Sequence, residues 1–250
     1  MPGLISRRDR RRPLLAACFC LPLLISALPA QAALTLSATR IVFDADKRSA
    51  SIVVNNPSDR PFAVQTWVNT SADDTSTAVP FIPSPPLFRL DPGKDQQVQI
   101  NGLPNALPTD RESLFFFNVQ EIPEANGQAD NVLNIALRTR IKFFYRPTQV
   151  QGHPSARLGE LQWTAHEQDG VLHLQVHNPT PFHYTFSRLE VSDNGRTHKL
   201  QQAPMLEPFT HQRVTFDGVK HTPGLQVTFS TINDFGGTTT PLHASVQAAP

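Results

Sequence analysis

The feature that most constrains the fold is a series of short runs in which apolar and polar residues alternate. Phe62–Val68 alternates with a period of two, and Val171–Val176 places Leu172, Leu174 and Val176 on one side. Such runs at about ten-residue spacing, bounded by Asn, Pro, Asp and Gly, are typical of antiparallel strands in a β-sandwich. No stretch of helix length shows a clean 3.6-residue apolar period, so we expect an all-β protein with few helices.

The runs fall into two groups. Leu114–Val119 in the first group is aromatic and unbroken, which is expected of a strand covered on both faces. A boundary falls near Arg146-Pro147, and the polar stretch Gln149–Pro154 follows it. We therefore predict two sandwich domains in series, over 34–147 and 148–250. The remaining predicted strands include Ser51–Val54, Gln97–Ile100, Leu161–Trp163, Tyr184–Phe186, Val214–Phe216 and Leu225–Phe229.

The first 33 residues have the composition of a targeting segment. Five arginines between Arg7 and Arg12 precede an apolar stretch from Leu14 to Leu28 and the small residues around Ala32-Ala33. These are the parts of a cleaved secretory signal, and the apolar stretch is shorter than the ~20 residues that span a bilayer. A lipoprotein signal ending at Cys18 is disfavoured because few apolar residues precede that position.

Removal of this segment changes the chemistry of the chain. Both cysteines, Cys18 and Cys20, leave with it, so the exported chain folds without disulfides. The segment also carries five of the 22 basic and one of the 21 acidic residues, which leaves 17 against 20 and a formal charge of −3. Neither nucleic acid nor a membrane is an expected partner, and any basic site must be local.

Catalytic and metal-binding patterns are missing from the sequence. It has no G-x-S-x-G, Walker, H-E-x-x-H or glycine-rich dinucleotide motif, so we expect no enzyme activity and no cofactor. His173 and His177 share one strand face but lie roughly 13 Å apart, too far for one ion. The alternative is a metal-dependent hydrolase whose ligands are the histidines at or after His153. Stoichiometric zinc in the purified protein would support it. A sugar-binding sandwich would need exposed aromatic residues, whereas Trp67 and Trp163 lie in patterns that suggest burial.

The stretch Asn131–Lys142 is the candidate binding surface. Leu133, Ile135 and Leu137 alternate with polar or small residues. An ordinary strand with one buried face explains this pattern. The sharper interpretation, which the periodicity alone does not favour, is an edge strand whose backbone and apolar row pair with a partner.

Several segments together resemble the periplasmic chaperones of the chaperone–usher pilus pathway. The strongest is Glu112–Pro123, which resembles the signature segment of that family. The other matches occur in the family's order and are Thr39–Phe43, Asn56–Ser58, Val64–Val68, Phe88–Gly93, Ile141–Pro147, Asn178–Phe182 and Ile232–Gly237.

The resemblance implies two immunoglobulin-like domains with a cleft between them. It also implies a function, which is to cap pilus subunits by strand donation and to deliver them to an outer-membrane usher. Leu133, Ile135 and Leu137 correspond to the donated row. Arg40 and Lys142 correspond to the cations that hold the subunit's terminal carboxylate, although surface charge is the ordinary interpretation of such residues.

Further expectations follow from the same resemblance. Glu112, Arg146 and Asp234 correspond to ion pairs between the domains. The segment between Pro123 and Asn131 is short and lacks flanking cysteines, which is typical of the short-loop branch. The apolar row also allows the free chain to form a self-capping dimer. Strict alternation puts Lys142 on the opposite face from Leu133, so either a bulge restores parity or the two sites use different faces. A periplasmic binding or adhesin module on a similar sandwich is the alternative function.

Overall fold

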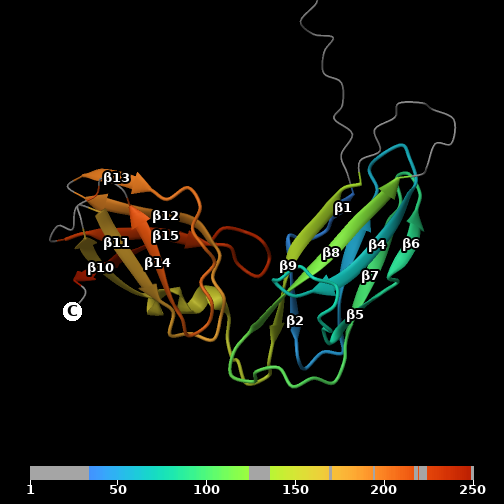
Figure 1. Ribbon diagram of the computed structural model, residues 1–250, viewed down its shortest axis with the longest axis horizontal. Coiled ribbons are helices and arrows are strands. Elements are labelled where there is room, and N and C mark those ends of the chain that lie inside the picture. The colour runs from blue at the N-terminus through green and yellow to red at the C-terminus, as the bar shows by residue number, and fades with distance from the viewer. Residues whose placement is uncertain are drawn as a thin grey trace, which may run out of the picture. The chain divides into compact units, whose positions relative to one another are not determined.

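Nearly all regular structure in the protein is β-strand (Figure 1). The computed structural model describes residues 34–123, 136–168, 171–193, 195–216, 219 and 224–248. The signal segment predicted over residues 1–33 lies outside this range. A single short 3-10 helix, η2 (Pro154–Glu160), occurs in the described part of the chain. No helix among the described residues is long and apolar enough to cross a membrane.

The first sandwich consists of two sheets. One has the order β1-β3-β7-β5, with β1 (Thr35–Leu36), β3 (Ser49–Asn55), β7 (Asp95–Gly102) and β5 (Phe81–Ser84). The other has the order β2-β9-β8-β4-β6, with β2 (Arg40–Asp44), β9 (Arg138–Arg146), β8 (Ser113–Pro123), β4 (Phe62–Asn69) and β6 (Leu87–Leu90). All pairs are antiparallel except β2 with β9, which is parallel.

The second sandwich is built in the same way. One sheet has the order β14-β11-β10-β17, with β14 (His211–Phe216), β11 (Val171–His177), β10 (Gln162–Gln168) and β17 (Gln247–Ala248). The other has the order β13-β12-β15-β16, with β13 (Arg196–Lys199), β12 (Phe186–Asp193), β15 (Gln226–Thr231) and β16 (Leu242–Ser245). The prediction of two all-β sandwiches is confirmed.

Each sandwich has its own hydrophobic core. In the first, Phe43, Phe81, Phe115 and Phe143 pack around one another, and the rings of Phe81 and Phe143 have centroids 4.7 Å apart. In the second, Trp163 is buried and its ring lies 5.2 Å from that of Phe229. Edge and tilted contacts of this kind are the preferred arrangements of aromatic rings.

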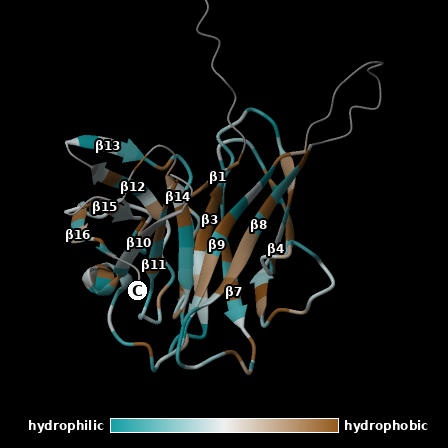
Figure 2. Cartoon of the chain, turned by 60° about the vertical axis from the view of Figure 1, so that its left-hand side comes forward, coloured by the Kyte–Doolittle hydropathy of each residue, from teal (hydrophilic) through white to brown (hydrophobic). Residues whose placement is uncertain are grey.

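The alternating runs place their apolar residues as predicted in most strands. On β11, Leu172, Leu174 and Val176 are fully buried. The strand β8 is hydrophobic over most of its length (Figure 2), and its residues Phe117 and Asn118 are both fully buried although they point to opposite faces. The prediction that this strand is covered on both faces is therefore confirmed.

The predicted burial of Trp163 is confirmed, whereas Trp67 is buried only in part. The core face of β4 is formed by Val64, Thr66 and Val68, so Trp67 points to the other face and is only half-buried. The Arg138 guanidinium of β9 lies above its ring, 5.0 Å from the centroid. This cation–π contact partly shields the indole from solvent on the face of the sheet that points away from the core.

Candidate binding site

The strand β9 has one edge that is only partly paired. On one side it pairs with β8 from Arg138 to Tyr145. On the other side it pairs with β2, but only from Lys142, which lies opposite Arg40, to its end. Among the described residues, Arg138–Ile141 therefore have no neighbouring strand on the β2 side. The unpaired backbone groups of such an edge can pair with a strand of another chain.

Arg40 stands where the free edge ends. Its side chain is largely buried, and Nη1 donates a hydrogen bond to the carbonyl oxygen of Ile232 at 3.0 Å. The guanidinium lies 5.7 Å from the centroid of the Phe144 ring. Its Nε is buried and has no hydrogen-bond partner in the structure. Burial lowers the pKa of Arg40, although the negative charges of Asp234 and Glu112 act in the opposite direction.

Lys142 lies next to Arg40 on the paired strand. Its Nζ donates a hydrogen bond to Oγ1 of Thr185 at 2.7 Å. Burial, and then the positive charge of Arg40, lower the pKa of Lys142 to about 8. The two cations thus repel each other in a partly desolvated place, which an anion between them would relieve.

No carboxylate among the described residues forms an ion pair with either cation. Each finds a neutral oxygen of the second sandwich instead, the Ile232 carbonyl for Arg40 and the Thr185 hydroxyl for Lys142. The arrangement suits a bound carboxylate, because both side chains keep further N–H donors for it.

A separate group of charged residues is already paired within the protein. The guanidinium of Arg146 donates to Glu112 Oε1 at 2.8 and 3.0 Å and to Asp234 at 3.0 and 3.1 Å. Glu112 also accepts the backbone N–H of His183 at 2.8 Å. Burial alone would lower the pKa of Arg146, but these hydrogen bonds and charges raise it. The three residues predicted as a group are in contact, while their role in setting the domain angle stays a prediction.

The predicted apolar row is described only in part. Leu133 and Ile135 lie outside the described residues, whereas Leu137 is described and is 48% exposed. The pairing of β8 with β9 runs from Arg138 to Tyr145 without a register shift, and Glu121 N–H continues it to the carbonyl of Leu137. No bulge therefore separates Leu137 from Lys142, and the two side chains point to opposite faces of the sheet.

Several features of the site were missed from the sequence. Thr185 lies 43 positions after Lys142, and Ile232 lies 192 positions after Arg40. Contacts between residues so far apart in the chain are common in β proteins and leave no local pattern in the sequence. Arg138 forms hydrogen bonds to Asn118 and Asp73, and Arg140 donates to the Thr70 carbonyl at 2.7 Å. The alternation of Arg138 and Arg140 on one strand face was the only local signal for this network.

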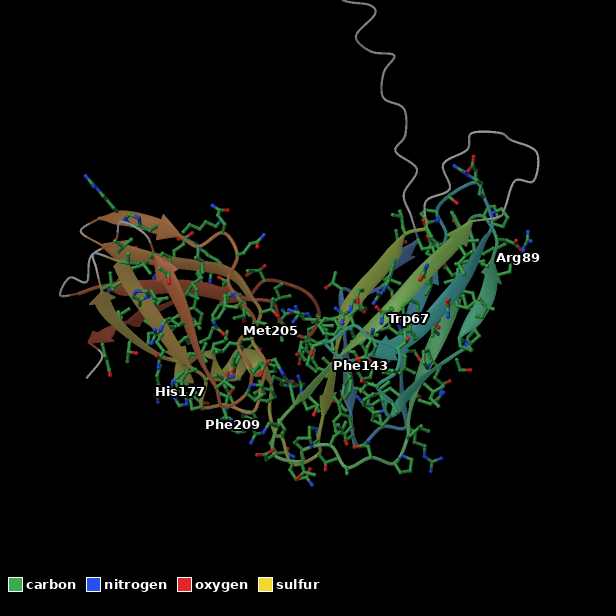
Figure 3. The ribbon with its side chains drawn as sticks, viewed as in Figure 1. Trp67, Arg89, Phe143, His177, Met205 and Phe209 are labelled. Atoms are coloured by element: carbon green, nitrogen blue, oxygen red, sulfur yellow. The ribbon has the colours of Figure 1, made fainter. Side chains whose placement is uncertain are left out.

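The late histidines form no metal centre in the described part of the chain, where no group of three potential ligands occurs. His177 and His211 are cross-strand partners on the second sandwich, and their rings stack with centroids 4.2 Å apart. Figure 3 labels His177 on that sandwich, and Trp67 and Phe143 on the first. Burial, and then the charge of His211, lower the pKa of His177.

Comparison with known proteins identifies the family. The model described as "Pili and flagellar-assembly chaperone, PapD N-terminal domain" matches residues 33–151. The model described as "Pili assembly chaperone PapD, C-terminal domain" matches residues 156–243. The chaperone protein FimB/FhaD of Bordetella pertussis is 36% identical over 248 residues, which cover 96% of this chain and 98% of the relative.

Solved structures agree with the sequence comparison. The crystal structure of the YadV chaperone has a TM-score of 0.73 at 32% identity, covering 85% of this chain and 98% of that one. A chain in the structure of the Salmonella enterica SafA pilin in complex with the SafB chaperone has a TM-score of 0.72 at 30% identity, covering 85% and 96%. The chain therefore belongs to the PapD-like family of periplasmic pilus assembly chaperones, which are not enzymes.

Proposed function

We propose that this chain binds pilus subunits in the periplasm through the free edge of β9 and the Arg40–Lys142 pair, and delivers them to an outer-membrane usher. The SafB relative forms a complex with a pilin, which supports the same class of partner for this chain. Pairing with a subunit's unpaired strand edge would protect that edge from aggregation.

The observation that carries the proposal is that the free edge ends at two cations. The edge beyond Lys142 is occupied by β2, so an added strand must stop beside Arg40. A chain end that carries a carboxylate is a C-terminus. The bound segment would therefore run parallel to β9, with its last residue at the cations and its earlier residues beside Arg138–Ile141. Charge-assisted hydrogen bonds would fix its register.

Opposite faces of β9 would then serve different tasks. Leu133, Ile135 and Leu137 would enter the apolar groove that a subunit's missing strand leaves open. Two observations support this division. Leu137 is exposed, and its side chain points to the opposite face of β9 from that of Lys142. In the free chain the same row would favour a self-capping dimer.

Four further assignments belong to the proposal. Residues 1–33 would be removed on export, and the domains would cover 34–147 and 148–250. The short, cysteine-free segment between Pro123 and Asn131 supports the short-loop branch of the family. Glu112, Arg146 and Asp234 would hold the two domains in the orientation that presents the cations to the subunit.

Co-expression of the chain with a pilus subunit gene from its own operon tests the function. We expect the tagged chaperone to recover soluble subunit from the periplasm in a one-to-one complex, because the added strand covers the subunit's edge. The matched control is the same subunit with a short polar extension at its C-terminus, which moves the carboxylate away from Arg40 and Lys142. Equal recovery of the extended subunit would contradict carboxylate anchoring, and no recovery of either would contradict the function.

The affinity of a carboxylate-ended peptide is expected to fall as the pH rises above about 8. Lys142 loses its proton near that pH in the free protein, so binding a carboxylate there requires proton uptake. The limiting slope is about tenfold per pH unit. Between about pH 8, the lowered pKa of Lys142, and pH 10.5, the ordinary pKa of a lysine, the folded state binds fewer protons than the unfolded chain. The free energy of unfolding should therefore rise with pH over this window.

Fluorescence anisotropy of a labelled peptide between about pH 7 and 9 measures the affinity. The matched variant is Lys142→Arg, which keeps its charge over this range and should show a flat profile. A wild-type profile as flat as that of the variant would show that Lys142 does not contact the carboxylate.

A further inference from the structure

The loop between β15 and β16 is organised by Asn233. The Asn233 Oδ1 accepts hydrogen bonds from the backbone N–H groups of Phe235 at 3.0 Å and Gly237 at 2.9 Å. The N–H of Asn233 in turn donates to the Gly237 carbonyl at 2.8 Å. Side-chain hydrogen bonds of this kind give a short loop a defined backbone conformation.

Phe235 at the tip of this loop is 95% exposed, more than the other exposed large hydrophobic residues of the described chain. Phe209, by comparison, is 40% exposed and lies under the guanidinium of Arg111. A whole aromatic ring in water on an ordered loop is unfavourable unless a partner covers it.

The loop lies against Arg40, one of the two cations of the binding site. Arg40 donates to the carbonyl of Ile232 at the start of the loop. A Cβ atom added to Gly236 would collide with Oγ1 of Thr39, the residue before Arg40. Phe235 therefore stands between two residues that touch the Thr39–Arg40 segment, Ile232 and Gly236. The acidic residue next to it in the chain, Asp234, is paired with Arg146.

We propose that Phe235 is a specificity-determining contact that packs against an apolar side chain in the last two residues of the bound subunit. The inference rests on the proposed function, because it requires a C-terminus at Arg40 and Lys142. It adds the chemical class of that terminus, which is a carboxylate accompanied by an aromatic or aliphatic side chain. The ordered loop makes the contact pre-organised, so little conformational entropy is lost when the ring is covered.

Three synthetic peptides provide the probe. Each has about 12 residues of alternating valine and threonine, with lysines at the amino end for solubility, and they end in Ser-Phe, Phe-Ser or Ser-Ser. Each is made with a free and with an amidated C-terminus. Their dissociation constants are measured by calorimetry for the wild type, for Phe235→Ala and for the control Leu87→Ala. Leu87 is 61% exposed on β6, three strands away from β9.

Phe235→Ala is expected to weaken at least one Phe-containing peptide by about five- to twentyfold and to leave the Ser-Ser peptide unchanged. Leu87→Ala should change none of them. The ring makes no core contact, so the variant should keep the Tm of the wild type.

Other outcomes separate this inference from the function beneath it. If amidation weakens binding but Phe235→Ala changes no peptide, the inference is overturned and the carboxylate anchor stands. If amidation has no effect on any peptide, both fail. If Phe235→Ala changes only the sedimentation of the free chain, the ring belongs to an interface between two copies, which also overturns the inference.

Discussion

Replacing Arg40 by alanine is expected to leave a folded chaperone that no longer retains pilus subunits. Arg40 would hold the subunit carboxylate by charge-assisted hydrogen bonds in a partly desolvated place, and truncation of such a partner costs about 2–5 kcal/mol of binding free energy. The fold should survive, because the side chain of Arg40 donates one hydrogen bond among the described residues, to the Ile232 carbonyl, and its burial carries a desolvation cost of its own. Lys142→Ala should act in the same direction. Recovery of soluble subunit from periplasm measures the effect.

The matched control is Arg89→Ala on β6. Arg89 is an exposed arginine of the same domain that pairs with Asp91, and β6 lies at the far edge of the sheet from β2. This variant should recover as much subunit as the wild type. Undiminished recovery by both Arg40→Ala and Lys142→Ala would remove the carboxylate anchor from the mechanism.

Replacing Arg146 by alanine is expected to destabilise the protein itself. Glu112 is 4% exposed and would lose its two hydrogen bonds from the guanidinium, leaving a buried carboxylate without its charge partner. Breaking a buried pair in this way costs about 3–5 kcal/mol of the free energy of unfolding. Urea denaturation followed by fluorescence measures the loss, and restoring part of it with the second change Glu112→Gln would identify the unpaired charge as its cause.

Arg157→Ala provides the comparison for that experiment. Arg157 pairs with Glu160 through two hydrogen bonds of 2.7 Å, but both side chains are at least a third exposed. Its removal should cost less than about 1 kcal/mol, because solvent screens such pairs. A loss of the same small size for Arg146→Ala would show that the Glu112–Arg146–Asp234 group contributes little to stability.

The strands could be predicted from the sequence because burial of one sheet face leaves a period of two. This period predicted the inward residues of β11 correctly. It could not tell which face of β4 meets the core, and the position of Trp67 outside the core was therefore not predicted. The guanidinium that lies over the Trp67 ring belongs to Arg138 of β9. This strand is distant from β4 in the sequence, and β8 lies between the two in the sheet.

The candidate site was less accessible to local patterns. Arg40 and Lys142 are about a hundred positions apart and become neighbours only because β2 pairs with β9 in parallel, for which neither segment carries a local signal. Both residues were predicted from the family resemblance. The candidate edge strand was predicted from the alternation of apolar and polar residues. Phe235 lay within a segment used for the resemblance, yet nothing in the sequence distinguishes an exposed aromatic residue from a buried one.

A crystal structure of the chain bound to a pilus subunit tests the central claim most directly. We predict that the subunit's terminal carboxylate lies within hydrogen-bond distance of Arg40 and Lys142, and that its last strand runs parallel to β9 along Arg138–Ile141. A subunit bound with its C-terminus elsewhere, or with its strand antiparallel to β9, would contradict the proposed mechanism.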